Sequence, residues 1–217
     1  MFNIHNFENL RAISELEESI CHLISKHLDK PIDISQLSRL HEYVDKFSLN
    51  ELRLSVFKDI NLLPWPQILL KSCFNQLSYE LGPDLLIQKK INLSIHIPGD
   101  DLSVLNAHTD CSSGDSPFEL VLWIPLTPSQ QTNSMFICSK EESRKYYACM
   151  RNGTTYKVNK DNAEYISIDH GQFLIFPPTL IHGNSINKTN QTRLSLNVRI
   201  KSVFSPYLCS MVGDRMF

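Results

Sequence analysis

The first third of the chain repeats apolar residues at helical spacing. From Leu10 to Leu28 they recur every three or four positions, and Pro31 ends the pattern. Three further helices are predicted before residue 84 on the same grounds. Their expected markers are Ser35 as a cap, an inward-facing Phe47, Ser48 as a start, Pro66 in a first turn and Gly82 as an end.

After Gly82 the apolar spacing changes to every second residue. In residues 91–97 the apolar side chains alternate with Asn92, Ser94 and His96, which is typical of a strand with two unlike faces. Further strands are predicted at residues 118–125, 134–138, 165–168, 172–176 and 193–203. Many short strands after a helical block predict an α+β fold whose second part is a sandwich or barrel.

The last predicted strand has one polar and one apolar face. The polar face carries Arg193, Ser195, Asn197, Arg199 and Lys201, and the residues between them are aliphatic. Two interpretations stay open at this point. The polar face lies in water, as in an ordinary antiparallel sheet, or the apolar face packs on the helices while the polar face lines a cavity.

Composition narrows the classes of function. The 217 residues are 42% hydrophobic and 20% charged, with a formal net charge of −2, which is ordinary for one soluble domain. We expect neither nucleic acid nor membrane as a partner, because the chain has no broad basic field and no apolar run of about 20 residues. Six scattered cysteines and no apparent export signal predict reduced thiols and a cytoplasmic location.

A histidine and an aspartate stand two residues apart at His108 and Asp110. On an extended chain, side chains at this spacing point to the same side and can reach one metal ion. The spacing alone is weak evidence, since His27 and Asp29 share it. That second pair lies at the end of a helical pattern, where the two side chains diverge, so we interpret it as surface.

A lone histidine, His182, follows the predicted strand 172–176 and two prolines. Two imidazoles and one carboxylate would leave three metal positions open, which suits non-haem Fe(II), whereas structural zinc takes four protein ligands. Downstream, Arg193 offers a guanidinium fork for a carboxylate, and Ser195 can add a hydrogen bond. If the strands of His182 and Arg193 face each other, a dicarboxylate such as 2-oxoglutarate would bridge them.

This set of residues resembles the Fe(II)- and 2-oxoglutarate-dependent oxygenases over residues 85–205. The resemblance implies a double-stranded β-helix (jelly-roll, cupin-like) core, an N-terminal helical region at 1–84 packed on one sheet, and a tail at 206–217, within one structural domain. Residues 97–101 and 115–126 are also similar to small bacterial oxygenases of carbohydrate gene clusters, such as the StrG-like group.

The resemblance also implies roles for single residues. His108, Asp110 and His182 would ligate Fe(II), Arg193 and Ser195 would bind 2-oxoglutarate, and Asn92 would face that co-substrate. With O₂, such an enzyme hydroxylates its substrate and releases succinate and CO₂. The expected substrate is a polar small molecule: a sugar, an aminocyclitol or a metabolite derived from an amino acid.

Two other functions remain as alternatives. One is a cupin-like, metal-dependent isomerase or hydrolase that does not use O₂, and the other is a carbohydrate-binding jelly roll without catalysis. Expectations also follow for four neighbouring side chains, three of which have two interpretations each. Asp115 is a substrate contact or part of a polar turn, Trp123 is core or pocket wall, His96 is structural or substrate-binding, and Cys111 is expected to point away from the metal.

Overall fold

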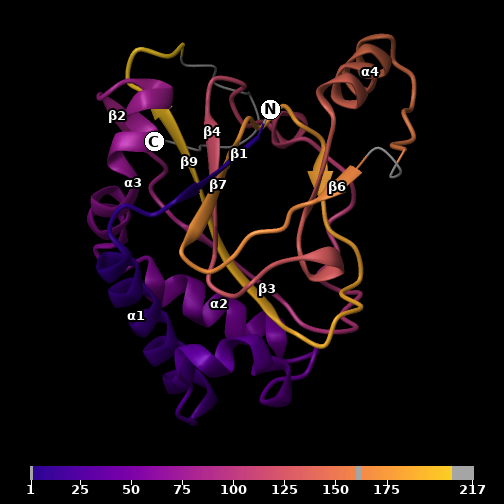
Figure 1. Ribbon diagram of the computed structural model, residues 1–217. Helices are drawn as coiled ribbons and strands as arrows, with labels where there is room; N and C mark the ends of the chain where they lie inside the picture. The colour runs from indigo at the N-terminus through magenta and orange to yellow at the C-terminus, as the bar shows by residue number, and fades with distance from the viewer. Residues whose placement is uncertain (1, 160–162, 207–217) are drawn as a thin grey trace.

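The helical region forms one layer of the molecule. The computed structural model describes residues 2–159 and 163–206 and is drawn in Figure 1. Its first helices are α1 (Leu10–Leu28), the 3₁₀ helix η1 (Ile34–Glu42), α2 (Leu49–Ile60) and α3 (Trp65–Leu81). The predicted start after Ser48 and the predicted end at Gly82 are both confirmed.

The second helix differs from its prediction. Its cap is Asp33 rather than Ser35: the Asp33 carboxylate accepts the Gln36 N–H at 3.2 Å, and the Gln36 side chain accepts the Asp33 N–H at 3.0 Å. The element is a short 3₁₀ helix that ends at Glu42. Phe47 therefore lies beyond it, in the connection to α2, and is 79% exposed, so the prediction of an inward Phe47 is wrong.

A large antiparallel sheet lies against these helices. Its strands follow the order β1-β7-β4-β9-β2, and β3 also pairs with β9. The strands are β1 (Asn3–Asn6), β2 (Leu85–Ile87), β3 (Asn92–His96), β4 (Leu120–Pro125), β7 (Gln172–Phe176) and β9 (Arg193–Ser202). The mixed α/β architecture with antiparallel sheets is thus as predicted, with strands at 91–97, 118–125 and 193–203 slightly shorter than expected.

One strand of this sheet was not predicted. β1 has a single strongly apolar residue, Ile4, and gives no alternating pattern. Its place depends on pairing with β7, in a register that runs from Asn3 opposite Ile175 to Asn6 opposite Gln172. The predicted helical region 1–84 therefore contributes a strand to the sheet, and its division from 85–205 stays a prediction; nearly all of the tail 206–217 lies outside the described residues.

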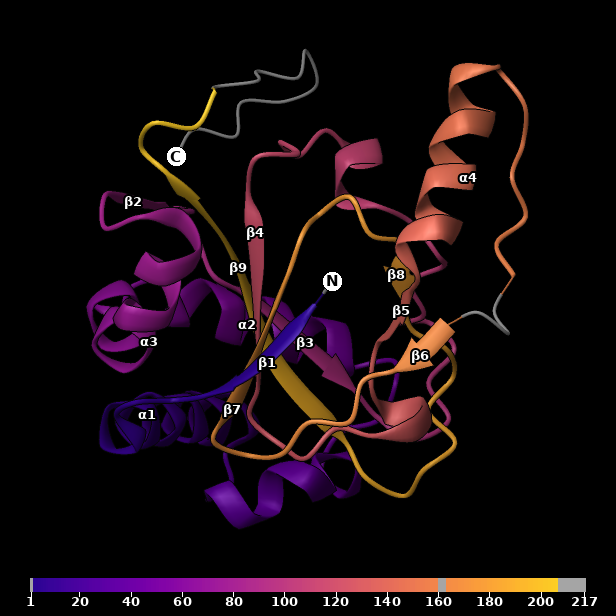
Figure 2. The same cartoon turned by 45° about the horizontal axis from the view of Figure 1, so that its top comes forward.

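A smaller sheet faces the large one. Figure 2 shows β5 (Phe136–Cys138), β6 (Ala163–Tyr165) and β8 (His182–Gly183) across from β4 and β9. Their order is β6-β5-β8. The predicted strand at 165–168 is displaced, because the ladder ends at Tyr165 and Ile168 forms only an isolated bridge with Ser129.

The main hydrophobic core lies between the helices and the outer face of the large sheet. The aliphatic side of β9 is fully buried there, against apolar residues of α1, α2 and α3. Burying one such aliphatic side chain contributes about 1.5–3 kcal/mol. Of the two interpretations of the last strand, the one that packs its apolar face on the helices is confirmed. The polar face consequently points between the two sheets.

A fourth α-helix, α4 (Lys140–Arg151), projects beside the small sheet and was also not predicted. It buries only Glu142 and Ser143, so it carries no apolar stripe. Its start does have a signature, since Ser139 caps the helix: its hydroxyl accepts the Glu142 N–H at 3.1 Å. Among the described helices, none combines the length and apolar character needed to cross a membrane.

Candidate metal centre and adjoining pocket

His108, Asp110 and His182 converge on one point between the sheets. The backbones of His108 and His182 form an antiparallel bridge, in which each N–H donates to the other carbonyl at 3.0 and 2.9 Å. Asp110 Oδ1 lies 3.5 Å from His182 Nε2 and 3.8 Å from His108 Nε2. One potential ligand atom from each residue lies within 4.8 Å of the other two.

Backbone carbonyls set the orientation of both imidazoles. His108 Nδ1 lies 2.7 Å from the Asn106 carbonyl, and His182 Nδ1 lies 2.9 Å from the Leu180 carbonyl. A proton on each Nδ1 satisfies these bonds and leaves Nε2 of each ring as the nitrogen that faces Asp110. Such outer contacts are how metal-binding histidines are commonly held in the ligating tautomer.

The charge states of these groups favour cation binding. Burial lowers the pKa of His108, and the nearby His182 lowers it further. Burial alone would raise the pKa of Asp110, but its hydrogen bond to His182 and the charges of His182 and Arg199 outweigh that effect and hold the pKa at about 2. At neutral pH the site therefore presents a carboxylate and at least one neutral imidazole, and metal ligation requires deprotonated groups of this kind.

Arg199, on the inner face of β9, holds the second oxygen of Asp110. Its Nη2 lies 2.7 Å from Asp110 Oδ2 and 3.3 Å from Asp115 Oδ2. Asp110 is thereby fixed with Oδ1 toward the imidazoles. Asp115, for which the sequence allows a substrate contact or a place in a polar turn, has its side chain buried against this guanidinium. Burial, together with the charge of Asp115, raises the pKa of nearby Glu119 to about 7.

Arg193 has a different environment from Arg199. It is only 4% exposed, donates one hydrogen bond to Ser94 Oγ at 3.0 Å, and lies 5.8 Å from the ring centre of Trp123. No ion pair joins it to a carboxylate of the described residues, and its Nε has no hydrogen-bond partner among them. Burial lowers the pKa of Arg193 to about 10, so it remains charged at neutral pH.

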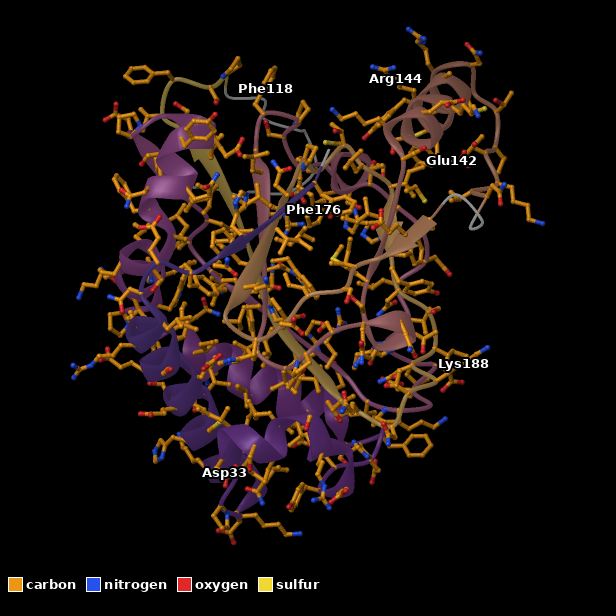
Figure 3. All side chains as sticks on the ribbon, in the orientation of Figure 1. Asp33, Phe118, Glu142, Arg144, Phe176 and Lys188 are labelled. Atoms are coloured by element: carbon orange, nitrogen blue, oxygen red, sulfur yellow. The ribbon has the colours of Figure 1, made fainter. Side chains whose placement is uncertain are left out.

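A cavity of about 200 Å³ connects the three converging side chains to Arg193. Asn92 and Trp123 also line it, so Trp123 is both buried and a pocket wall. Asn92 donates to Asn197 Oδ1 at 3.1 Å. Figure 3 labels Phe176 in the interior between the sheets; its ring meets that of His182 edge-on, with centres 5.0 Å apart.

The remaining predicted residues lie near this cavity without lining it. Ser195 is buried next to Arg193, and its hydroxyl has no partner within the described part of the chain. His96 is fully buried on β3, with Nδ1 3.4 Å from the Asn133 carbonyl, and its side chain does not line the cavity. Cys111 belongs neither to the converging group nor to the cavity wall.

Comparison with known proteins adds information about the fold. No protein-family model matches the chain, and no curated protein matches it. Two solved structures of the non-heme monooxygenase ThoJ, one a nickel complex and one without ligand, are similar to it at 17% identity. Their TM-scores are 0.53 and 0.55, and the alignments cover 93% of this chain and 73% and 74% of theirs.

Further structural neighbours are less similar. The structure of HygX from Streptomyces hygroscopicus with iron bound has 14% identity, a TM-score of 0.46, and alignment over 69% of this chain and 68% of its own. The similarity to ThoJ shows a shared fold.

Proposed function

We propose that this protein is an Fe(II)- and 2-oxoglutarate-dependent oxygenase that hydroxylates a polar small molecule and releases succinate and CO₂. The observation that carries the proposal is the pairing of two features in one cavity. Three metal-ligand side chains converge at one end, and a buried arginine without a carboxylate partner among the described residues stands at the other.

The donor set fits Fe(II). His108, Asp110 and His182 offer two nitrogens and one oxygen, already oriented toward one another by backbone carbonyls and by Arg199. Three protein ligands leave coordination positions for small molecules, and this combination is typical of non-haem iron oxygenases. A closed structural zinc site would need a fourth ligand, and the described residues bring no further histidine, cysteine or acidic side chain into this group.

The cavity also fits a dicarboxylate. Burying a charged group without a counterion costs free energy. An anion that enters the cavity and pairs with Arg193 would offset that cost. A carboxylate would accept two parallel hydrogen bonds from the guanidinium, and the Ser195 hydroxyl and Asn92 amide lie on neighbouring strands for further contacts. The opposite end of 2-oxoglutarate would then reach the metal ligands.

When bound, the iron and 2-oxoglutarate would supply the oxidative chemistry. The chain would bind the co-substrate through Arg193, hold Asp110 in place through Arg199 and exclude water with Trp123 and Phe176. We extend the proposal to the architecture: the two facing sheets are the halves of a double-stranded β-helix, in a chain allied to the StrG-like oxygenases. The division into a helical region 1–84 and a catalytic core 85–205 belongs to the same proposal.

Anaerobic titration with Fe(II) and then 2-oxoglutarate tests the proposal. The complex should develop the weak visible charge-transfer band of this enzyme class, and admission of O₂ should yield succinate. Replacing a metal ligand, His182→Ala, should weaken Fe(II) binding by more than about 100-fold, beyond the loss caused by outer contacts. The control His22→Ala removes an exposed histidine of α1 and should change nothing.

A second pair of variants tests the binding of 2-oxoglutarate. Arg193→Met should weaken 2-oxoglutarate binding at least about 30-fold while Fe(II) still binds. Arg11→Met, at a position 91% exposed, should bind both as the original protein does. Iron-dependent turnover that survives His182→Ala, or product formation without O₂, would contradict the proposal, and the second result would favour an isomerase or hydrolase.

A further inference from the structure

A second hollow adjoins the metal cavity and lies between α2 and the loop 102–105. Its volume is about 420 Å³, and it shares Asn92, Ser94, Leu105 and Asn197 with the metal cavity. The metal cavity alone, at about 200 Å³, is smaller than most small-molecule sites, which occupy about 300–1,000 Å³. A co-substrate bound at Arg193 would fill much of it, so a substrate needs the adjoining space.

Both walls of this α2 groove carry large apolar side chains. Leu54 and Phe57 of α2 form one side, and Leu102 and Leu105 form the other. Leu54, Leu102 and Leu105 are 49%, 64% and 60% exposed, which is unusual for three leucines that share one hollow. A ligand with an apolar body would cover them.

The loop side of the groove is pinned to the metal-ligand strand. Asn184, two residues after His182, accepts the Leu105 N–H and donates to the Ser103 carbonyl. Gly183 lies so close to the loop that a Cβ there would come within 2.8 Å of the Leu105 carbonyl oxygen. These contacts join the groove wall to the strand that carries His182. A molecule bound in the groove would therefore have a defined position relative to the metal ligands.

A single cationic side chain stands among the described residues that line this groove. Among the described residues that line the groove, Arg53 alone carries a charge. It is half-buried, and its Nη2 donates to Asn50 Oδ1 at 2.6 Å on the same helix. No carboxylate in the described ranges forms an ion pair with Arg53, so most of its N–H donors remain available to a ligand.

We infer that the α2 groove binds the substrate, and that the substrate is an organic anion with an apolar portion, held by Arg53. The inference rests on the proposed function, since it identifies the groove as the substrate part of the same site. An acidic group of the substrate would meet Arg53, its apolar part would lie on the leucines, and the reacting carbon would extend past Asn92 and Asn197 toward the metal.

A matched pair of fluorescent probes tests the inference without metal or co-substrate. Anilinonaphthalene sulfonate carries an anion on an apolar ring system, and phenylnaphthylamine has the same rings without the sulfonate. Both are titrated into the full chain in excess chelator. We expect one saturable site, with sulfonate affinity reduced about tenfold in Arg53→Gln, because a charge-assisted hydrogen bond is lost. Phenylnaphthylamine should bind both proteins equally.

Two further variants complete the design. Arg144→Gln removes an exposed arginine on α4, far from α2 (Figure 3), and should bind both probes as the original protein does. Leu54→Glu places a negative charge among the leucines and should weaken the sulfonate more than the neutral probe. Equal sulfonate binding by Arg53→Gln and the original protein, or equal losses in Arg53→Gln and Arg144→Gln, would overturn the inference. Because no iron is present, these outcomes are independent of whether the protein proves to be an oxygenase.

Discussion

The two faces of β9 differ in role: one packs in the hydrophobic core, and the other carries polar side chains between the sheets. Leu194, Leu196 and their aliphatic neighbours have no exposed surface and pack on the helices. Arg193 and Ser195, which alternate with these leucines along the strand, are also buried, yet Arg193 Nε and Ser195 Oγ have no hydrogen-bond partner in the described part of the chain. The outer face is saturated with protein contacts, whereas the inner face retains binding capacity. Stability and ligand binding are thus separated by strand alternation alone.

The largest expected effect is on the outer face. Leu196→Ala should lower the free energy of unfolding by about 2–5 kcal/mol, because a fully buried side chain leaves a cavity. Urea denaturation measures this change, and Fe(II) affinity should be retained in the folded variant. Leu62→Ala, at a site 79% exposed, is the control and should change stability by less than about 0.5 kcal/mol. Loss of iron binding in folded Leu196→Ala would contradict the assignment of stability to the outer face of β9 and of ligand binding to the inner face.

His96, opposite Arg193 in the β3–β9 ladder, should make stability depend on pH. Burial, reinforced by the charge of Arg193, lowers the pKa of His96 from 6.5 to about 4. The unfolded chain therefore binds the proton more tightly, and stability is full above pH 6.5 and is lost as the pH falls toward 4. The loss attributable to this shift is roughly 3 kcal/mol. In His96→Gln this part of the pH dependence should disappear from denaturation curves; an unchanged pH profile would contradict the assignment.

Arg193→Met should change stability with the opposite sign to Leu196→Ala. Removing a buried charge that has no carboxylate partner among the described residues should raise the free energy of unfolding by about 1–2 kcal/mol. The same substitution should remove the thermal stabilisation given by 2-oxoglutarate in the presence of Fe(II), since the ligand stabilises only the state that binds it. If Arg193→Met instead destabilises the protein as strongly as Leu196→Ala, Arg193 is a structural residue and the contrast between the faces fails.

The smallest effect concerns the support of the metal ligands from α4. The Tyr147 hydroxyl donates to Thr109 Oγ1 at 3.0 Å, and Thr109 lies between His108 and Asp110. Tyr147→Phe should cost about 1 kcal/mol of Fe(II) binding free energy, a several-fold change measurable by competition with a chelating dye. Tyr79→Phe, at a site 85% exposed, should leave the affinity unchanged. A larger loss of protein stability than of metal affinity would assign Tyr147 to folding instead.

A feature of the fold or of the candidate site could be predicted where its pattern lies in a short stretch of the sequence. His108 and Asp110 could be singled out because spacing on an extended chain determines which side chains share a face, and β9 displayed its two faces in the same way. Arg199 belonged to that face too. Its contact with Asp110 was missed because the contact depends on which part of the inner face meets the segment after Thr109, and only the packed fold decides that.

Other features had no periodic signal at all. β1 and α4 lack an apolar pattern, and their positions depend on pairing with β7 and on side-chain contacts such as Ser143 Oγ with the Ile181 N–H. Phe47 was placed inward because helical spacing was extended past the true end at Glu42. The α2 groove forms where α2 and residues 102–105, which are far apart in sequence, come together. No pattern along the sequence predicts that contact.

Diffraction at the iron absorption edge, from crystals grown anaerobically with Fe(II) and 2-oxoglutarate, tests the central claim most directly. The account predicts a single anomalous peak within bonding distance of His108, Asp110 and His182, with one carboxylate of 2-oxoglutarate against the Arg193 guanidinium. Iron bound elsewhere, or 2-oxoglutarate held away from Arg193, would contradict it.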